Sequence, residues 1–411
     1  METIIFYVIL GVIAVEFLLE RYLDYLNRTM WSDKLPDELK GIYDAEQYEK
    51  SQRYEKVNHR FSQFTSTFSV VLMLAFIVFG GFPFVDNIAR GWAEHPIWVA
   101  LIFFGLLFIA SDLINMPFGI YATFKIEEDF GFNKTTPKIY ALDKVKSYLV
   151  TAVLGGGIMA LIVWFYMLTG TNFWLYTWAF ITAFSIFMVM FHSNIIVPLF
   201  NKQTPLEEGE LKTAIAEMAE KAGFNLDNIY VIDGSKRSTK ANAYFTGFGA
   251  KKRIVLFDTL INDLSTEEIV AVLAHEIGHY KKKHVLGGLV MSVMQTGLML
   301  FILSLCIAHA EMSSALGVDI PSFHVGLVTF GILYSPLSFI MGIGMNVFSR
   351  KNEFEADAFA AKYASGEELS NALKKLSVKN LSNLKPHPIY VFFHYSHPTL
   401  LQRLETLKEI K

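Results

Sequence analysis

Long apolar stretches recur along the chain, separated by segments rich in polar and charged residues. Seven of them approach or exceed the roughly 20 residues that a helix needs to cross a bilayer core. We therefore predict seven transmembrane helices, at 3–19, 64–84, 97–120, 147–169, 173–197, 285–308 and 324–347. The first has neither a basic leading segment nor a small-residue cleavage site, so we expect an uncleaved anchor rather than a signal peptide.

The distribution of basic residues gives these helices an orientation. Lys and Arg gather in the segments 21–63, 121–146, 198–284 and 348–411, whereas the three intervening loops together contain only Arg90. Basic loops stay on the cytoplasmic side of a membrane. We therefore predict an N terminus outside the cytoplasm, and a cytoplasmic location for the segments 198–284 and 348–411.

Polar patterning outside the membrane predicts one soluble insert. Residues 207–222 have the spacing of an amphipathic helix, and residues 228–231 and 253–257 that of short strands, with a possible third strand at 242–245. The expected fold is a mainly α membrane protein whose soluble part contains a small β-sheet. Its expected parts are five transmembrane helices (1–197), the insert (198–284), transmembrane helices six and seven (285–347) and a cytoplasmic segment (348–411), which includes helices near 349–364 and 367–378.

Composition supports a membrane protein and narrows the candidate chemistry. Hydrophobic residues make up 53% of the 411 residues and charged residues 18%, where about a quarter is usual. The net charge of −3 gives no indication of a nucleic-acid partner, and we expect a monomer in the lipid bilayer. Cys306 is the only cysteine, so metal ligands would have to come from His, Asp and Glu.

One motif suggests a metal. Ser265 and Glu268 have the spacing of a helix-capping box, and the helix that they would start contains His275-Glu276-Ile277-Gly278-His279. Histidines four residues apart share a helix face and can bind one zinc ion, while Glu276 could take a proton from a water molecule beside it. Taken alone, the motif is equally compatible with the end of an ordinary amphipathic helix. We expect this helix to continue through 280–284 directly into the sixth transmembrane helix.

A catalytic zinc site needs a third ligand, and Glu353 is the best candidate. Glu353 and Asp357 are four residues apart, on one face of a predicted helix at the same membrane side as the histidines. Glu353 would bind the metal, and Asp357 would accept a hydrogen bond from a ligand histidine and fix its orientation. Glu355 would point elsewhere. A solvated acidic helix start is the alternative explanation.

These motifs resemble those of the type I CAAX prenyl proteases, which are integral-membrane zinc endopeptidases. The resemblance covers most of the chain. It is carried by the two zinc motifs together with the segments 126–134, 198–206, 232–238, 242–245 and 394–403. One departure is Lys240-Ala241, where the family more often has His-Ser.

The resemblance implies roles that the residue pattern does not. Asn242 would bind the substrate backbone, while His397 and Arg403 would lie near the zinc and stabilise negative charge on the scissile carbonyl. It also implies that the seven helices enclose a chamber, and polar residues within the spans fit this expectation. Because the chain is shorter than eukaryotic members and has no retrieval signal, we expect a bacterial inner-membrane protein, more than one of the endoplasmic reticulum.

The expected function is zinc-dependent hydrolysis of peptide bonds, with one catalytic Zn²⁺ and a peptide or protein substrate that could be prenylated. One alternative is a quality-control zinc protease of the heat-shock type, which would cleave unprenylated membrane proteins. Another is a seven-helix transporter or receptor with an incidental zinc motif, which would show no metal-dependent hydrolysis.

Overall fold

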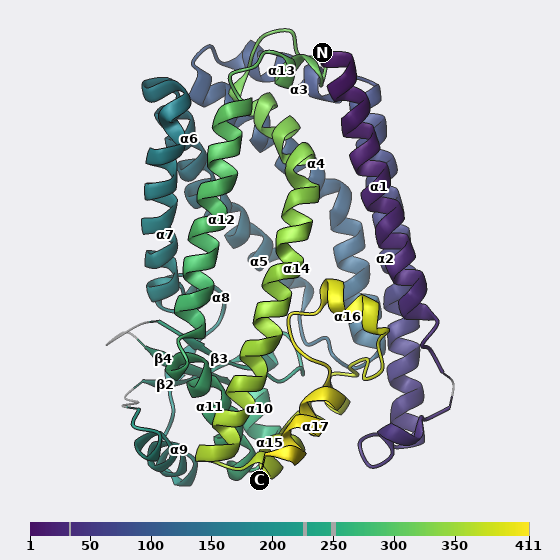
Figure 1. Cartoon of the computed structure of the whole chain (residues 1–411), viewed down its shortest axis with the longest axis vertical. Helices are drawn as coiled ribbons and strands as arrows, with labels where there is room; N and C mark the ends of the chain where they lie inside the picture. Colours follow the sequence, from purple (N-terminus) through teal and green to yellow (C-terminus); the bar gives the residue numbers. More distant parts are fainter. Residues whose placement is uncertain (33, 225–227, 248–251, 411) are drawn as a thin grey trace.

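The computed structural model describes residues 1–32, 34–224, 228–247 and 252–410. Within them, six helical segments are long and apolar enough to cross a membrane: Glu2–Arg28, Ala45–Val78, Pro96–Glu127, Pro137–Phe200, His284–Cys306 and Phe323–Tyr363. The N terminus lies at one end of the molecule and the C terminus at the other (Figure 1). The chain is therefore a multi-pass helical protein, and its two termini lie at opposite ends of the molecule.

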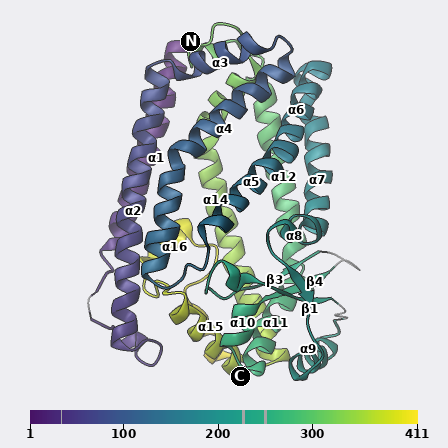
Figure 2. The same ribbon diagram turned by 180° about the vertical axis from the view of Figure 1, so that it is seen from behind.

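The fourth segment contains both the predicted fourth and fifth spans, which is why six segments stand where seven spans are predicted. Gly170, with φ of 56°, begins a short 3-10 turn (Gly170–Asn172) in its middle. The helices on either side of that turn, α6 and α7, lie next to each other (Figures 1 and 2). The helices of this segment are α5 (Pro137–Val150), α6 (Gly156–Thr169), α7 (Phe173–Ile195) and α8 (Val197–Phe200), with a π-helical turn at Thr151–Gly155.

The other membrane segments are also largely single helices. Short helices lie at the end of the molecule that carries the N terminus, and a π-helical turn (Ala122–Glu127) extends α4 at the opposite end (Figures 1 and 2). The predicted second span ends too late, because Gly80, with φ of 73°, turns the chain after residue 79. The helices are α1 (Glu2–Arg28), α2 (Ala45–Val78), α3 (Gly81–Trp92), α4 (Pro96–Tyr121), α12 (His284–Cys306), α13 (Glu311–Ser314) and α14 (Phe323–Tyr363).

Two predicted helix boundaries are wrong, and both lie next to the candidate metal ligands. Residues 324–347 and 349–364 form a single 41-residue helix, α14, because no proline or glycine interrupts residues 345–363. Conversely, helix α11 (Thr266–Lys281) does not continue into α12. Lys283 adopts a left-handed conformation with φ of 61°, which ends one helix and redirects the chain into the next.

A four-stranded sheet lies beside α11 at the C-terminal end of the molecule (Figure 2). Its order is β1-β2-β4-β3, with β2 and β4 parallel and the two outer pairs antiparallel. Three strands are near their predicted positions, whereas β1 was not predicted, since three residues are too few to show alternation. The strands are β1 (Gln203–Pro205), β2 (Ile229–Ile232), β3 (Ala243–Thr246) and β4 (Arg253–Phe257).

Apolar side chains from this sheet and its surrounding helices form one buried core. Ile254 and Leu256 of β4 pack with Ile215 of α9 (Glu210–Lys221) and with Leu273 and Ile277 of α11. The remaining helices of this part are α10 (Asp258–Asp263), α15 (Gly366–Lys379), α16 (Pro388–His394) and α17 (Leu400–Glu409). The core therefore supports the helix that carries both candidate histidine ligands.

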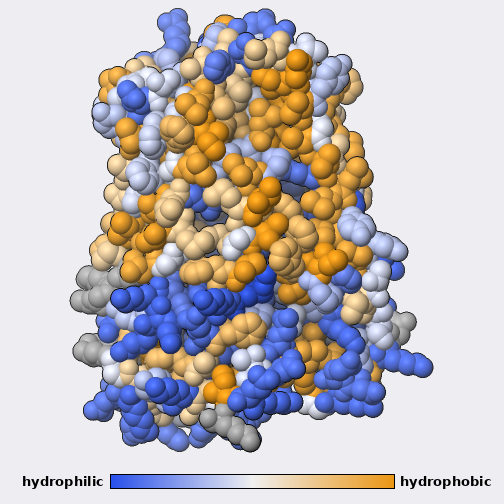
Figure 3. Space-filling model, viewed as in Figure 1, coloured by the Kyte–Doolittle hydropathy of each residue, from blue (hydrophilic) through white to orange (hydrophobic). Residues whose placement is uncertain are grey.

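The surface divides into an apolar part and a hydrophilic part. Apolar residues cover the region of the long helices, and hydrophilic residues dominate the end with α11, α15 and α17 (Figure 3). In the most apolar window of each membrane segment, at most 22% of the residues are buried. Some polar groups inside the spans pair with each other, as where Ser335 donates a hydrogen bond to Glu16 (2.6 Å).

Candidate metal centre

A capping box starts α11, the helix that carries both candidate histidine ligands. The Ser265 hydroxyl accepts a hydrogen bond from the Glu268 backbone, and the Glu268 carboxylate accepts one from the Ser265 backbone, which confirms the predicted capping box. His275 and His279 are therefore one helical turn apart on the same face. Both side chains point towards the lower part of α14, where Glu353 lies.

Gly278 allows α11 and α14 to approach closely. A Cβ atom at this position would lie 3.1 Å from both the Cα atom of Ala356 and the Cβ atom of Phe359. Contacts this short would force the backbones apart, so only glycine fits without adjustment. The close approach brings Glu353 within reach of the histidines.

Three side chains converge on one point. The Nε2 atoms of His275 and His279 are 3.1 Å apart, and the Glu353 carboxylate oxygens lie 3.5 and 3.3 Å from them, respectively. One ligand atom from each residue falls within 4.8 Å of the others. The Oε2 atom of Glu353 is buried and has no hydrogen-bond partner among the described residues. Facing ring nitrogens beside a buried carboxylate oxygen that forms no hydrogen bond suit a cation, and this donor set fits zinc.

Asp357 contacts His275 on the side of the ring that faces away from the metal point. His275 Nδ1 lies 2.8 Å from Asp357 Oδ1. In the neutral ring, an Nδ1–H that donates to this carboxylate leaves Nε2 free to bind a metal. Arg403 donates from Nε to the other Asp357 oxygen (2.9 Å). Asp357 is completely buried, so this guanidinium also compensates its charge.

The C-terminal residues named by the family resemblance lie at the same centre. Arg403 Nη1 is 3.6 Å from Glu353 Oε2, and His397 Nδ1 is 3.0 Å from Glu353 Oε1. The two side chains differ in exposure: 64% of the His397 side chain is accessible, compared with 11% for Arg403. His397 can therefore meet a substrate from solvent, whereas Arg403 mainly contacts Asp357 and Glu353.

Burial and charge alter the acid–base properties of this cluster. Burial lowers the pKa of His275, but the neighbouring carboxylates of Asp357 and Glu353 outweigh burial and raise the pKa to about 9 in the metal-free site. Burial is also the largest influence on Glu276, and it raises the pKa of that carboxyl above its ordinary value. A raised pKa makes Glu276 a stronger base than a solvated glutamate.

Asn242 lies next to an edge strand. It precedes β3, its side-chain oxygen accepts a hydrogen bond from the Ala243 backbone (2.9 Å), and the residue is exposed. β3 is the last strand in the sheet order and contacts α11. The strand that follows Asn242 therefore presents an outer edge close to the metal helix.

Lys240, part of the departure from the family pattern, has its own set of contacts. Its ammonium group pairs with Glu127 (2.8 Å), donates to the Tyr54 hydroxyl (3.0 Å) and lies over the ring of Phe132. These contacts direct the side chain towards the end of α4 and towards α2. Lys240 thus ties the segment before the strand to the membrane helices.

Two residues near the ligands were not assigned by sequence reasoning. His284 Nδ1 lies 3.1 Å from His279 Nδ1, and His284 Nε2 lies 3.3 Å from Glu355 Oε2. Glu355 was expected to point elsewhere. The spacing of five residues between His279 and His284 did not predict this contact, because a continuous helix would place the two on different faces.

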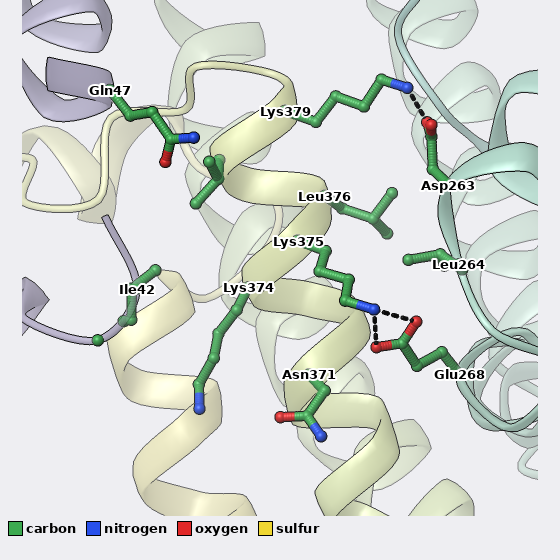
Figure 4. Close-up of a pocket in the computed structure, with 12 residues that line it drawn as sticks. Ile42, Gln47, Asp263, Leu264, Glu268, Asn371, Lys374, Lys375, Leu376 and Lys379 are labelled. Carbon is green, nitrogen blue, oxygen red and sulfur yellow. Dashed lines mark hydrogen bonds and ion pairs between the residues drawn. The ribbon is translucent and has the colours of Figure 1, made fainter. Parts of the chain in front are cut away.

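A separate cavity of about 630 Å³ lies beside α15 and contains none of the predicted site residues (Figure 4). Two of its lysines are neutralised, Lys375 by Glu268 (2.7 Å) and Lys379 by Asp263 (Figure 4). These pairs attach α15 to α10 and α11. The cavity is thus lined by ion pairs between helices and is separate from the candidate metal centre.

The long apolar helices and this ligand set together define an integral-membrane zinc metallopeptidase. Sequence models of two families match the chain: "CAAX prenyl protease N-terminal, five membrane helices" over residues 25–202, and "Peptidase family M48" over residues 205–411. The chain belongs to peptidase family M48 and is a homologue of CAAX prenyl protease 1.

Individual relatives agree over almost the full length. The chain is 36% identical to CAAX prenyl protease 1 of Saccharomyces cerevisiae, covering 97% of this chain and 94% of the relative. It is 33% identical to the Homo sapiens homologue, with 96% and 93% covered. A crystal structure of S. mikatae Ste24p superposes with a TM-score of 0.93 at 36% identity, covering 98% of this chain and 99% of that one. These relatives are eukaryotic and give no support to the predicted bacterial origin.

Proposed function

We propose that this metallopeptidase cleaves prenylated proteins near their C terminus, at a site on the cytoplasmic side of the membrane. The single observation that carries the proposal is the convergence of His275, His279 and Glu353, within 4.8 Å, in a chain aligned end to end with CAAX prenyl proteases. The basic segments 198–284 and 348–411, which supply these residues, support the cytoplasmic assignment.

We assign the ligands as His275, His279 and Glu353, with Asp357 orienting the first. A zinc ion held there supplies Lewis-acid polarisation of the scissile carbonyl and activation of a water molecule. Glu276 would accept the proton of the attacking water and return it to the leaving amine. Replacing Glu353 with Ala should therefore lower the zinc content of the purified protein, and full zinc occupancy in that variant would remove Glu353 from the ligand set.

His397 and Arg403 would act on charge that develops during hydrolysis. The exposed imidazole of His397 can donate a hydrogen bond to the oxygen of the reacting carbonyl. Arg403 would hold Asp357 and Glu353 in place and add positive potential, since its guanidinium contacts both. Asn242 and the edge of β3 would align the substrate backbone by strand addition, which uses the unpaired groups of an edge strand.

We also propose that the helices make seven passages and enclose a chamber. The two termini lie at opposite ends of the molecule, which fits an odd number of passages (Figure 1). Counting α6 and α7 as two passages, because a turn separates them, gives seven. A low buried share in every membrane segment, at most 22%, fits helices that face lipid on one side and open space on the other.

Cleavage of matched peptides by the purified full-length protein would test the function. A prenylated CAAX peptide should be cleaved, and its unprenylated twin should be cleaved more slowly. Glu276→Ala should retain zinc and lose activity by roughly 10²–10⁴-fold, the usual contribution of a general base. Equal cleavage of the two peptides would instead favour a quality-control protease, and normal turnover by Glu276→Ala would remove the assigned base.

A further inference from the structure

We infer that His284 and Glu355 are positioning residues that fix which ring nitrogen of the ligand His279 faces the metal. The inference rests on the proposed function only in taking His279 as a zinc ligand. It concerns two side chains that touch neither the metal point nor the predicted substrate edge, and that the reaction described above does not use.

The geometry forms a chain of polar contacts leading away from the metal. His279 Nε2 faces His275 Nε2, while His279 Nδ1 lies 3.1 Å from His284 Nδ1. His284 Nε2 continues to Glu355 Oε2 at 3.3 Å. The two imidazole rings meet edge to face, at an interplanar angle of 74°. Only 8% of the His284 side chain is accessible, so neighbouring side chains rather than water must satisfy its nitrogens.

Hydrogen-bond accounting gives this chain a direction. A carboxylate only accepts, so His284 must carry its proton on Nε2 to bond with Glu355. Nδ1 of a neutral His284 is then an acceptor, and the proton between the two rings belongs to His279 Nδ1. His279 Nε2 consequently has a free lone pair, which is the form that binds a metal.

The same device serves the other histidine. Asp357 accepts a hydrogen bond from Nδ1–H of His275 directly, and Glu355 acts on His279 through His284. Asp357 and Glu355 both belong to α14, as does Glu353. One helix therefore supplies a ligand and the final acceptors behind both ligand histidines.

The chain break after α11 makes the contact possible. In a continuous helix, residues five apart point about 140° away from each other, so His284 would turn away from His279. Lys283, with φ of 61°, is one of only two non-glycine residues with positive φ in the described part of the chain. Unfavourable backbone of this kind persists where other interactions require it. Here it turns His284 back towards His279.

Zinc affinity, measured by competition with a chromophoric chelator on the full-length protein in detergent, would test the inference. His284→Phe preserves the ring but removes both nitrogens, and Glu355→Leu removes the acceptor. Each should weaken zinc binding by roughly 10–100-fold, the usual effect of losing a hydrogen-bond partner of a ligand. Glu355→Gln retains an acceptor oxygen and should stay within a few-fold of wild type.

Glu20→Leu is a matched control, since Glu20 also faces a histidine, His394, at 3.4 Å with a similarly half-exposed side chain. It should leave zinc affinity unchanged. In the cobalt-substituted protein, His284→Phe and Glu355→Leu should shift the visible absorption bands, whereas Glu355→Gln should not. If the loss in Glu355→Leu came from a general change in structure, Glu355→Gln would not be expected to retain zinc affinity.

Two results would overturn the inference: wild-type zinc affinity in Glu355→Leu, whose half-exposed site tolerates leucine, or equal losses in Glu355→Leu and Glu355→Gln. His279→Ala separates this failure from a failure of the proposed site. If His279→Ala loses zinc while Glu355→Leu does not, the ligand assignment stands and the relay is wrong. If His279→Ala retains full zinc, the ligand assignment itself is wrong.

Discussion

At His275, metal binding and protonation of the imidazole ring depend on the same atom. Its Nδ1 faces Asp357 and its Nε2 faces Glu353, and these two carboxylates raise the pKa of the metal-free imidazole to about 9 despite burial. Below that pH the ring is protonated in the folded, metal-free protein. A metal can bind only after the Nε2 proton leaves, so proton and zinc compete for the same atom.

Zinc affinity should therefore increase with pH. Between pH 6 and 8, where His275 is protonated, we expect the apparent affinity to rise about tenfold per pH unit and to level off above pH 9. The stability of the metal-free protein should instead decrease as pH rises. The stability contributed by this proton is complete below the unfolded value of 6.5 and is lost as pH rises through 9. Chelator competition and thermal unfolding at several pH values would measure both, and a pH-independent affinity would contradict this assignment.

At the scale of elements, the approach of α11 to α14 sets the geometry of the centre. Gly278→Ala would place a methyl group 3.1 Å from Ala356 and Phe359, so the two helices must separate by a few tenths of an ångström. We expect lower thermal stability, by about 1–3 kcal/mol as for overpacked cores, together with weaker zinc binding. Gly288→Ala in α12 is the control, because open space surrounds its Cβ position. Equal behaviour of the two variants would argue against a tight helix contact.

The junction between α11 and α12 can be tested at Lys283. Glycine adopts positive φ without strain, so Lys283→Gly should leave zinc binding intact and stabilise the protein by up to ~1 kcal/mol. Lys283→Val should destabilise it and weaken zinc binding, since β-branched residues strongly disfavour this conformation. The neighbouring exposed Lys282 has an ordinary φ of −82°, and Lys282→Gly should bring no gain. Thermal midpoints and zinc titrations of the three variants would distinguish these effects.

At the scale of the whole molecule, a polar junction joins the membrane helices to the sheet. Arg237 donates two hydrogen bonds to Asp143 of α5 (2.8 and 2.9 Å) and one to the Phe200 carbonyl (2.8 Å). The backbone of residues 237–239 also bonds to residues 132–134. The soluble part is thus fixed to the membrane part at several points.

Arg237→Ala should loosen this junction and cost about 2 kcal/mol, because it leaves a partly buried carboxylate without its partner. Arg237→Lys should recover little of the loss, since an ammonium group cannot reproduce the paired geometry. Lys236→Ala, at the exposed neighbouring position, should cost much less, since Lys236 acts on Asp143 only through its charge and forms no hydrogen bond with it. Unfolding midpoints and peptidase activity would be compared, and a stable, fully active Arg237→Ala variant would contradict the role of the junction.

Much of this architecture could be predicted because its signals are local. Apolar length marked the membrane helices, the Ser265–Glu268 box located the start of α11, and four-residue spacing paired His275 with His279. Local signals failed where the chain changes direction or continues unexpectedly. The stop at Lys283 depends on a backbone conformation that lysine rarely adopts, and the merging of two predicted helices into α14 depends on the absence of any breaker between them.

By itself, the sequence determined the membrane class, the metal-binding residue types and their spacing, because hydrophobic length and helical periodicity are properties of neighbouring residues. Only the tertiary structure decided which distant groups meet: Glu353 with both histidines, Arg403 with Asp357, and His284 with His279 against Glu355. Such contacts depend on how closely α11 and α14 pack and where the chain turns. Both involve residues far apart in the sequence, as for Arg403 and His275, which are 128 positions apart.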